Sequence, residues 1–131
     1  MREMMALQDR DAAAPLDVGT LAQLSAIQRK GRPGFMDQVI TLFLLTAPNM
    51  IKDLEVAART DEVIALRRLS HSLKSCSAVI GALSLASLCE ALEAVARGGS
   101  VLDANARIGA IAHEYNRVEA ALTGARLLLR A

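Results

Sequence analysis

The sequence predicts an all-α protein, an antiparallel four-helix bundle with an additional helix or helices at its N-terminus. Apolar residues make up 53% of the 131 residues and aromatic residues only 2%, with alanine and leucine dominant, a mixture that favours helix over sheet. Apolar side chains recur at spacings of three and four, and no stretch shows convincing period-two alternation. The turns between these segments are short enough for antiparallel neighbours.

Length, charge and cysteine content limit what such a bundle can do. We expect one bundle domain over residues 16–131, after an N-terminal extension or linker end over 1–15 in which Met4, Met5 and Leu7 have loose helical spacing. The formal net charge of +1 and the lack of a basic run with aromatics argue against nucleic-acid binding. The two cysteines, thirteen residues apart, predict buried thiols in a reducing, cytoplasmic setting. No secretory signal or membrane span is visible.

The first half of the chain predicts two helices joined by a turn. Asp17 is placed to cap a helix that ends at Arg29 to Gly31. Residues 31–34 (Gly-Arg-Pro-Gly) are the strongest turn signal in the sequence, and a long helix is expected over 35–58. Pro48 lies inside that helix and predicts a kink, or two helices that meet at Ala47. The residues expected to face inward are Val18, Leu21, Leu24 and Ile27 in the first helix, and Val39, Leu42, Phe43, Met50, Leu54 and Ala57 in the second.

The second half predicts three more helices. The central one is expected over 61–82, capped by Thr60 and Asp61 and stopped at Gly81. Ser84 is placed to cap the next helix, which should end at Gly98 and Gly99, and Ser100 with Asp103 has the spacing of a capping box. The last helix is expected over 102–129. The inward residues are Leu85, Leu88, Cys89, Leu92 and Val95 in the fourth helix, and Ile108, Ile111, Tyr115, Val118 and Leu122 in the last.

The central helix carries the candidate site. Its apolar residues Leu66, Leu69, Leu73, Cys76 and Ile80 fit one seam of a bundle, and at about 100° per residue His71 falls on the opposite, exposed face. An exposed imidazole beside several cations outlines an anion site, and small side chains beyond it leave room for a docking partner. The residues that share the face of His71 are Ile64, Arg67, Arg68, Lys74, Ser75 and Ala78.

The run from His71 to Ala82, followed by Leu88, Leu92 and Glu93, resembles the signature of histidine-containing phosphotransfer (HPt) domains. The resemblance extends over residues 16–122. It implies a four-helix bundle that accepts a phosphoryl group from the aspartate of one receiver domain and passes it to another receiver. It also implies that His71 is the phosphorylated residue and Lys74 the cation beside the phosphate. The chain departs from the family pattern at Ser75, where glycine is most frequent, and at Val79, where asparagine is common.

These residue types suit phosphotransfer. A neutral imidazole nitrogen is a nucleophile that forms covalent intermediates, and an exposed ring can be approached in line. We expect Lys74 to neutralise charge on the phosphoryl oxygens, and Arg67 and Arg68 to steer the acidic pocket of a receiver toward the site. Ile64, Ser75 and Ala78 are expected in the contact with the receiver. No cofactor or metal of its own is expected, since no carboxylate pair lies near His71; Mg²⁺ should come from the receiver.

The resemblance favours a relay module without autonomous kinase activity, monomeric in isolation. It is expected to be the C-terminal module of a hybrid sensor histidine kinase and to lie in the cytoplasm, including as the cytoplasmic end of a membrane-bound kinase. Two alternatives remain: a helical adaptor that binds receivers without phosphotransfer, and a phosphoacceptor fragment of a sensor kinase. Without its surrounding motif, a single exposed histidine would be an ordinary surface residue. His113 has no such motif and is expected to be structural or exposed, and Cys76 and Cys89 are expected to fill the core.

Overall fold

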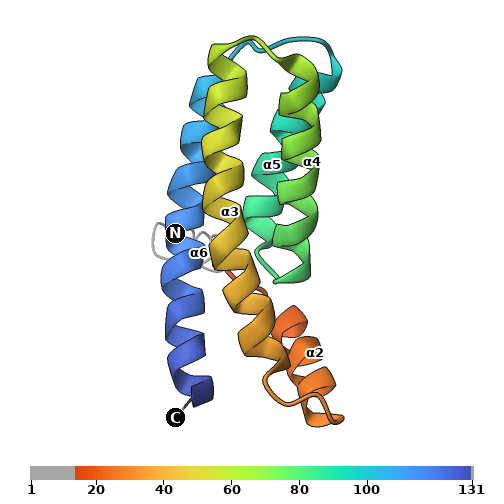
Figure 1. Cartoon of the computed structure of the whole chain (residues 1–131), viewed down its shortest axis with the longest axis vertical. Coiled ribbons are helices and arrows are strands. Elements are labelled where there is room, and N and C mark those ends of the chain that lie inside the picture. Colours follow the sequence, from red (N-terminus) through yellow and green to blue (C-terminus); the bar gives the residue numbers. More distant parts are fainter. Residues whose placement is uncertain (1–13, 131) are drawn as a thin grey trace, which may run out of the picture.

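The computed structural model describes the backbone of residues 14–130 and the side chains of residues 14–127. Within this range lie the helices α2 (Val18–Arg29), α3 (Phe35–Arg59), α4 (Val63–Val79), α5 (Leu83–Arg97) and α6 (Ala104–Arg130). The predicted fold class is confirmed: α3 to α6 form the antiparallel four-helix bundle, and α2 is the additional helix (Figure 1). The helical spacing noted before residue 13 lies outside the described residues. No described helix combines the length and the apolar character that a membrane span needs.

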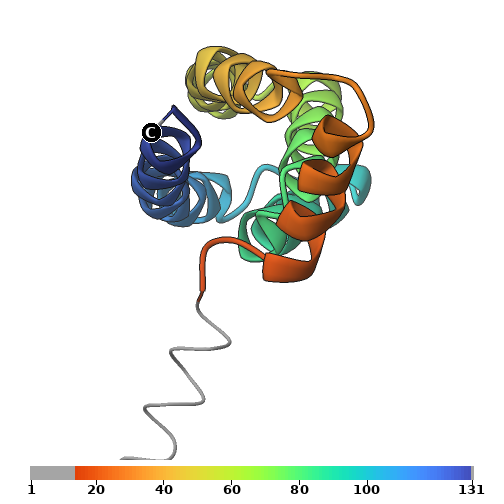
Figure 2. The same cartoon turned by 90° about the horizontal axis from the view of Figure 1, so that it is seen from below.

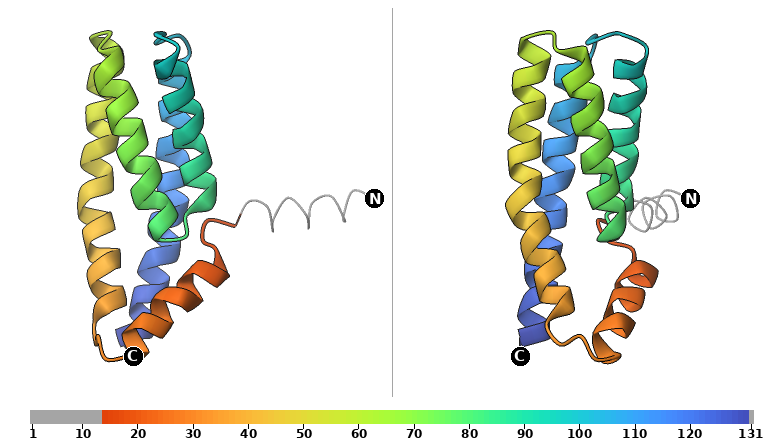
Figure 3. Two further views of the ribbon diagram at one scale, coloured as in Figure 1. Left: turned by 90° about the vertical axis from the view of Figure 1, so that its right-hand side faces the viewer. Right: turned by 45° about the vertical axis from the view of Figure 1, so that its right-hand side comes forward.

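The bundle has two long and two short helices. α3 and α6 contain 25 and 27 residues, whereas α4 and α5 contain 17 and 15. The long pair therefore extends past the short pair, and α2 lies across the space below the lower ends of α4 and α5 (Figures 2 and 3). The amide of Asp17 donates to the carbonyl of Gly81 at 2.7 Å, which fixes the start of α2 to the turn between α4 and α5.

Gly81 has to be a glycine in this turn. Its φ of +83° lies in the left-handed region, and a Cβ built there would come within 3.0 Å of the Cβ of Thr20. The predicted stop at Gly81 is confirmed, as are the turns at residues 31–34, where Gly31 and Gly34 have φ of 107° and 76°, and at Gly98 and Gly99.

The core lies between α3, α4, α5 and α6, and in α6 all five of the residues predicted to face inward are buried. The prediction was wrong for Leu42, Val18 and Ile27, which are 62%, 79% and 41% exposed. α2 packs against only the lower end of the bundle, so it buries one side chain, Leu24, which is 8% exposed. The largest fully buried apolar side chains are Ile40, Leu54, Leu66, Leu73, Ile80, Leu85, Leu92, Ile111, Leu122 and Val118.

α3 runs through Pro48 without a break. The alternative of two helices that meet at Ala47 is therefore wrong. Figure 1 shows the ribbon of α3 changing direction along its length. This agrees with the other predicted outcome, a bend within one continuous helix.

The cap predicted at Asp17 is confirmed. Its carboxylate accepts hydrogen bonds from the backbone N–H of Thr20 at 2.9 Å and from the Thr20 hydroxyl at 2.7 Å. These two bonds to the charged form hold the pKa of Asp17 below its ordinary value.

The cap predicted for α4 is wrong. Glu62 is the residue before the helix and makes no side-chain cap bond, while Asp61 has φ of 53° and links α3 to α4. Thr60 instead ends α3, where its hydroxyl donates to the carbonyl of Val56 at 2.9 Å. The two helices join through a tight turn that leaves no residue in the extended conformation that a side-chain N-cap needs.

The caps predicted for α5 and α6 are also wrong. Ala82 precedes α5, so Ser84 lies inside the helix. The Ser100 hydroxyl accepts from the amide of Leu102 at 2.9 Å and closes a local turn, and Asp103 takes φ of 60° just before α6 begins. Residue spacing alone does not distinguish a capping box from a turn stabilised by a side chain, because in both a serine hydroxyl accepts a hydrogen bond from a nearby backbone amide.

Candidate functional site

The buried face of α4 is formed by Leu66, Ser70, Leu73, Ser77 and Ile80. Two of these residues are serines, whose hydroxyls donate to the carbonyls of Leu66 at 2.6 Å and Leu73 at 2.7 Å. Leu69 and Cys76, which were expected on the seam, are only partly buried. The buried face of α4 is therefore centred closer to the two serines than the apolar spacing predicts. As a result, His71 lies at the edge of the contact with α5 and not directly opposite the core.

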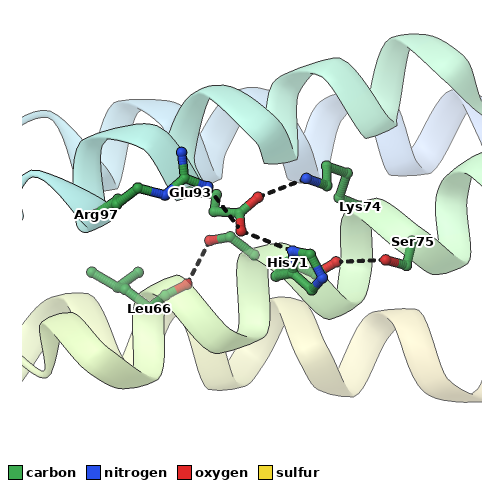
Figure 4. Close-up of polar contacts among 7 residues, drawn as sticks. Leu66, His71, Lys74, Ser75, Glu93 and Arg97 are labelled. Carbon is green, nitrogen blue, oxygen red and sulfur yellow. Dashed lines mark hydrogen bonds and ion pairs between the residues drawn. The ribbon is translucent and has the colours of Figure 1, made fainter.

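His71 is exposed, as expected, and one of its ring nitrogens is already occupied. The side chain is 60% exposed, and Nδ1 lies 2.8 Å from Oε2 of Glu93 on α5 (Figure 4). An ionised carboxylate can only accept a hydrogen bond, so in the neutral imidazole Nδ1 carries the proton and Nε2 keeps the lone pair. The nitrogen with the free lone pair is the one on the far side of the ring from Glu93.

Glu93 is the buried charge of the site. Its side chain is 5% exposed, and besides His71 it contacts the ammonium of Lys74 at 2.8 Å and the guanidinium of Arg97 at 3.3 Å. The hydrogen bond from Lys74, with a smaller contribution from His71, overcomes the cost of burial and lowers the pKa of Glu93 to about 2. Glu93 is therefore ionised at neutral pH, as the proton assignment on His71 requires.

A hollow beside His71 joins these residues to the cationic face of α4. It is lined by Ile64, Arg67, Arg68, His71, Ser72, Glu93 and Arg97. Lys74 and Arg97 contact the one buried carboxylate, and Arg67 and Arg68 line the same hollow, so the cations near the ring outnumber the anions. The arrangement favours an anion in front of Nε2.

The other predicted site residues fall on both sides of the histidine. Ile64 is 72% exposed and, with Arg67 and Arg68, borders the hollow. Ser75 and Ala78 lie exposed on the C-terminal side of His71 along α4, and the Ser75 hydroxyl donates to the carbonyl of His71 at 3.1 Å. Lys74 turns toward Glu93, with its side chain 27% exposed.

Two residues of this site were missed. Glu93 was noted only as part of a motif, without a role, and Arg97 was not considered. A usable signal was present, because Glu93 lies four residues after Cys89, among the inward positions of its helix, and a charged residue there needs partners. Arg97 follows it by one further helical turn, on the same face.

The remaining candidates take no part in the site. His113 is exposed on α6, as expected. Cys89 is buried, as expected, and burial raises the pKa of its thiol to about 12, whereas Cys76 is partly exposed; neither forms a disulfide. In the part of the chain that the structure describes, no group of three or more His, Cys, Asp or Glu side chains could hold a metal ion.

Comparison with known proteins shows a match to one protein family and to solved structures. A family model described as Hpt domain matches residues 38–121. The crystal structure of histidine-containing phosphotransfer protein B (HptB) from Pseudomonas aeruginosa PAO1 is similar, with a TM-score of 0.77 and 27% identity, over 86% of this chain and 95% of that one. The histidine-containing phosphotransfer protein ZmHP2 from maize has a TM-score of 0.80 at 22% identity, over 98% and 96% of the two chains, and shows the fold alone. A search of curated proteins gave no significant match.

Proposed function

The chain belongs to the Hpt domain family, and from this premise we propose that His71 takes a phosphoryl group on Nε2 from a receiver-domain aspartate and passes it to a second receiver. The observation that carries the proposal is the hydrogen bond between His71 Nδ1 and the ionised Glu93, at 2.8 Å. In the neutral imidazole this bond leaves Nε2 unprotonated, on a ring that is 60% exposed.

The proposed transfer needs no separate proton acceptor. The lone pair of Nε2 attacks phosphorus in line, the P–N bond forms, and the P–O bond to the aspartate breaks, so that the carboxylate leaves with its electron pair. The imidazole then carries a positive charge, with its proton still on Nδ1 and facing Glu93. The carboxylate stabilises that charge as it develops. The reverse sequence passes the group to the next aspartate.

The neighbours of His71 take supporting roles in this proposal. Lys74 neutralises the phosphoryl oxygens, and its ammonium is already ordered one helical turn from the ring by Glu93. Arg67 and Arg68 attract the acidic pocket of a receiver and raise the rate of encounter. Ile64, Ser75 and Ala78 complete the contact surface around the histidine; the last two are small enough for a close approach.

The proposal gives the chain a relay role without kinase activity of its own. The Mg²⁺ needed for aspartate phosphorylation is expected from the receiver. A place at the C-terminal end of a hybrid sensor kinase in the cytoplasm, and a monomeric state in isolation, stay predictions from the family resemblance. Western blotting of the protein from its source cells, with an antibody against the bundle, tests whether the bundle is part of a hybrid kinase. The apparent mass of the detected band distinguishes a longer protein from the bundle alone.

A transfer assay tests the proposal. The purified chain is mixed with receivers that carry ³²P-aspartyl phosphate, and the label is expected to move to it. The His71→Gln variant should take no label while keeping its helical circular dichroism, and His113→Gln, a change of the other histidine, should be labelled normally. Incubation with ATP and Mg²⁺ alone should give no label.

The same assay separates the alternatives. Label on the His71→Gln variant would place the acceptor elsewhere and contradict the proposal. Receiver binding without any label, equally strong in His71→Ala, would identify an adaptor. Labelling by ATP alone would identify a kinase fragment.

A further inference from the structure

The arginine on α5 beside the histidine carries an inference that rests on the proposed function and extends it. Nη2 of Arg97 lies 3.3 Å from Oε2 of Glu93, the oxygen that also contacts His71 Nδ1 (Figure 4). Oε1 is taken by Lys74 at 2.8 Å. Two carboxylate oxygens thus hold three partners, and Arg97 is the most distant of them. It is the partner that Glu93 holds least firmly.

Arg97 also has the freedom and the position to act on His71. Its side chain is 56% exposed, against 27% for Lys74, and it lines the hollow beside the imidazole. A guanidinium presents several N–H donors in a planar fork that matches the oxygens of a phosphoryl group.

We propose that Arg97 leaves Glu93 and binds the phosphoryl group when that group is attached to His71. Phosphorylation places a new anion on Nε2, with more charge than the shared carboxylate presents to the arginine. The ion pair between Arg97 and Glu93 is exposed on the arginine side and contributes little, whereas charge-assisted bonds to phosphoryl oxygens are stronger. Oε2 of Glu93 is then left to the Nδ1 proton of His71.

The exchange would give the phosphoryl group a cation from each of two helices, Lys74 from α4 and Arg97 from α5. The other charged groups that line the hollow, Arg67 and Arg68, are exposed on α4 and have no ordered anionic partner at the histidine. Arg97 differs from them because Glu93 already holds it beside the ring in the unphosphorylated state.

The test phosphorylates His71 chemically, so that no receiver is needed. Potassium phosphoramidate transfers its phosphoryl group to the imidazole and releases ammonia. ³¹P NMR then follows the ionisation of the attached phosphoryl group with pH in the wild type, Arg97→Gln, Arg97→Lys and Arg59→Gln. Arg59 is an exposed arginine at the end of α3 and serves as the matched charge control.

The phosphoryl group of Arg97→Gln is expected to ionise at higher pH than that of the wild type, because a cation beside it has been removed. Arg97→Lys should lie between the two, and Arg59→Gln should match the wild type. In the wild type, the ¹⁵Nε resonance of Arg97 should move on phosphorylation. With a receiver present, the equilibrium should shift toward the phosphorylated receiver by about tenfold in Arg97→Gln, the effect of one charge-assisted hydrogen bond.

An unchanged phosphoryl titration and an unchanged transfer equilibrium in Arg97→Gln would overturn the inference. A purely structural role, in which Arg97 only holds Glu93, would alter the unphosphorylated ring and leave the phosphoryl titration as it was, which also overturns it. Normal labelling by a receiver with no dependence on Arg97 rejects this inference alone. A clear dependence on Arg97 after chemical phosphorylation, with no labelling by any receiver, rejects the proposed function alone.

Discussion

Replacement of Glu93 by glutamine removes the charge that faces the ring of His71 and keeps the shape of the side chain. In the native site the carboxylate accepts from His71 Nδ1 and from the Lys74 ammonium, both at 2.8 Å. The amide has only one acceptor oxygen and no charge, so it cannot serve both partners in this way. The variant therefore weakens the group that stabilises the imidazolium as it forms.

The size of the effect follows from that one bond. A hydrogen bond to a charged group contributes about 1.5–3 kcal/mol, and the bond to Nδ1 strengthens as the ring becomes positive in the transition state. Its loss should slow phosphotransfer to His71 roughly 10- to 100-fold, since about 1.4 kcal/mol corresponds to a factor of ten in rate.

Single-turnover transfer from a phosphorylated receiver, followed by rapid quench, measures this rate. Glu90→Gln is the matched control, because Glu90 is exposed on the same helix, and it should transfer at the wild-type rate. Urea unfolding of each variant shows that the bundle is folded under the assay conditions. A wild-type rate in Glu93→Gln would refute the role that we give to the carboxylate.

Three further predictions concern the fold that holds the site. Leu73→Ala removes a side chain that is 0% exposed in the core and should lower the free energy of unfolding by about 2–5 kcal/mol in urea titrations; a loss below 1 kcal/mol would contradict the packing described. Gly81→Ala places a side chain at φ of +83° and 3.0 Å from Thr20 Cβ, and the conformation alone should cost about 1–2 kcal/mol. Because the folded pKa of Glu93 is lowered from 4.5 to about 2, its ionised contacts stabilise the fold fully above pH 4.5 and lose that contribution as the pH falls toward 2. The difference in unfolding free energy between the wild type and Glu93→Gln should therefore shrink over that interval, and a constant difference would contradict the assignment.

The order of the helices and the exposure of His71 could be predicted because each depends on local sequence. Apolar spacing and glycine turns place the five helices, and five apolar positions locate the exposed face of α4 closely enough to leave His71 in solvent. The buried serines Ser70 and Ser77 were missed because spacing counts only apolar residues, whereas a small hydroxyl that bonds to its own helix can also be buried.

The partners of the histidine could not be predicted in this way. Glu93 lies 22 residues beyond His71, and its contact depends on how α4 and α5 are rotated against each other. The four-residue spacing between Glu93 and Arg97 is visible in the sequence, but their shared role at the imidazole appears only when both helices are in place. The wrong caps have a related cause, since Asp61 and Asp103 adopt positive φ values of 53° and 60° to satisfy turns between packed helices.

The central claim is that Glu93 keeps the proton on Nδ1 of His71 and leaves Nε2 as the atom that is phosphorylated. ¹⁵N NMR of the histidine-labelled chain, recorded before and after transfer from a phosphorylated receiver, tests it directly. The account predicts a protonated Nδ1 beforehand and a phosphorus–nitrogen coupling at Nε2 of His71 afterwards. A proton on Nε2 beforehand, or phosphorus coupled to Nδ1 or to His113, would contradict it.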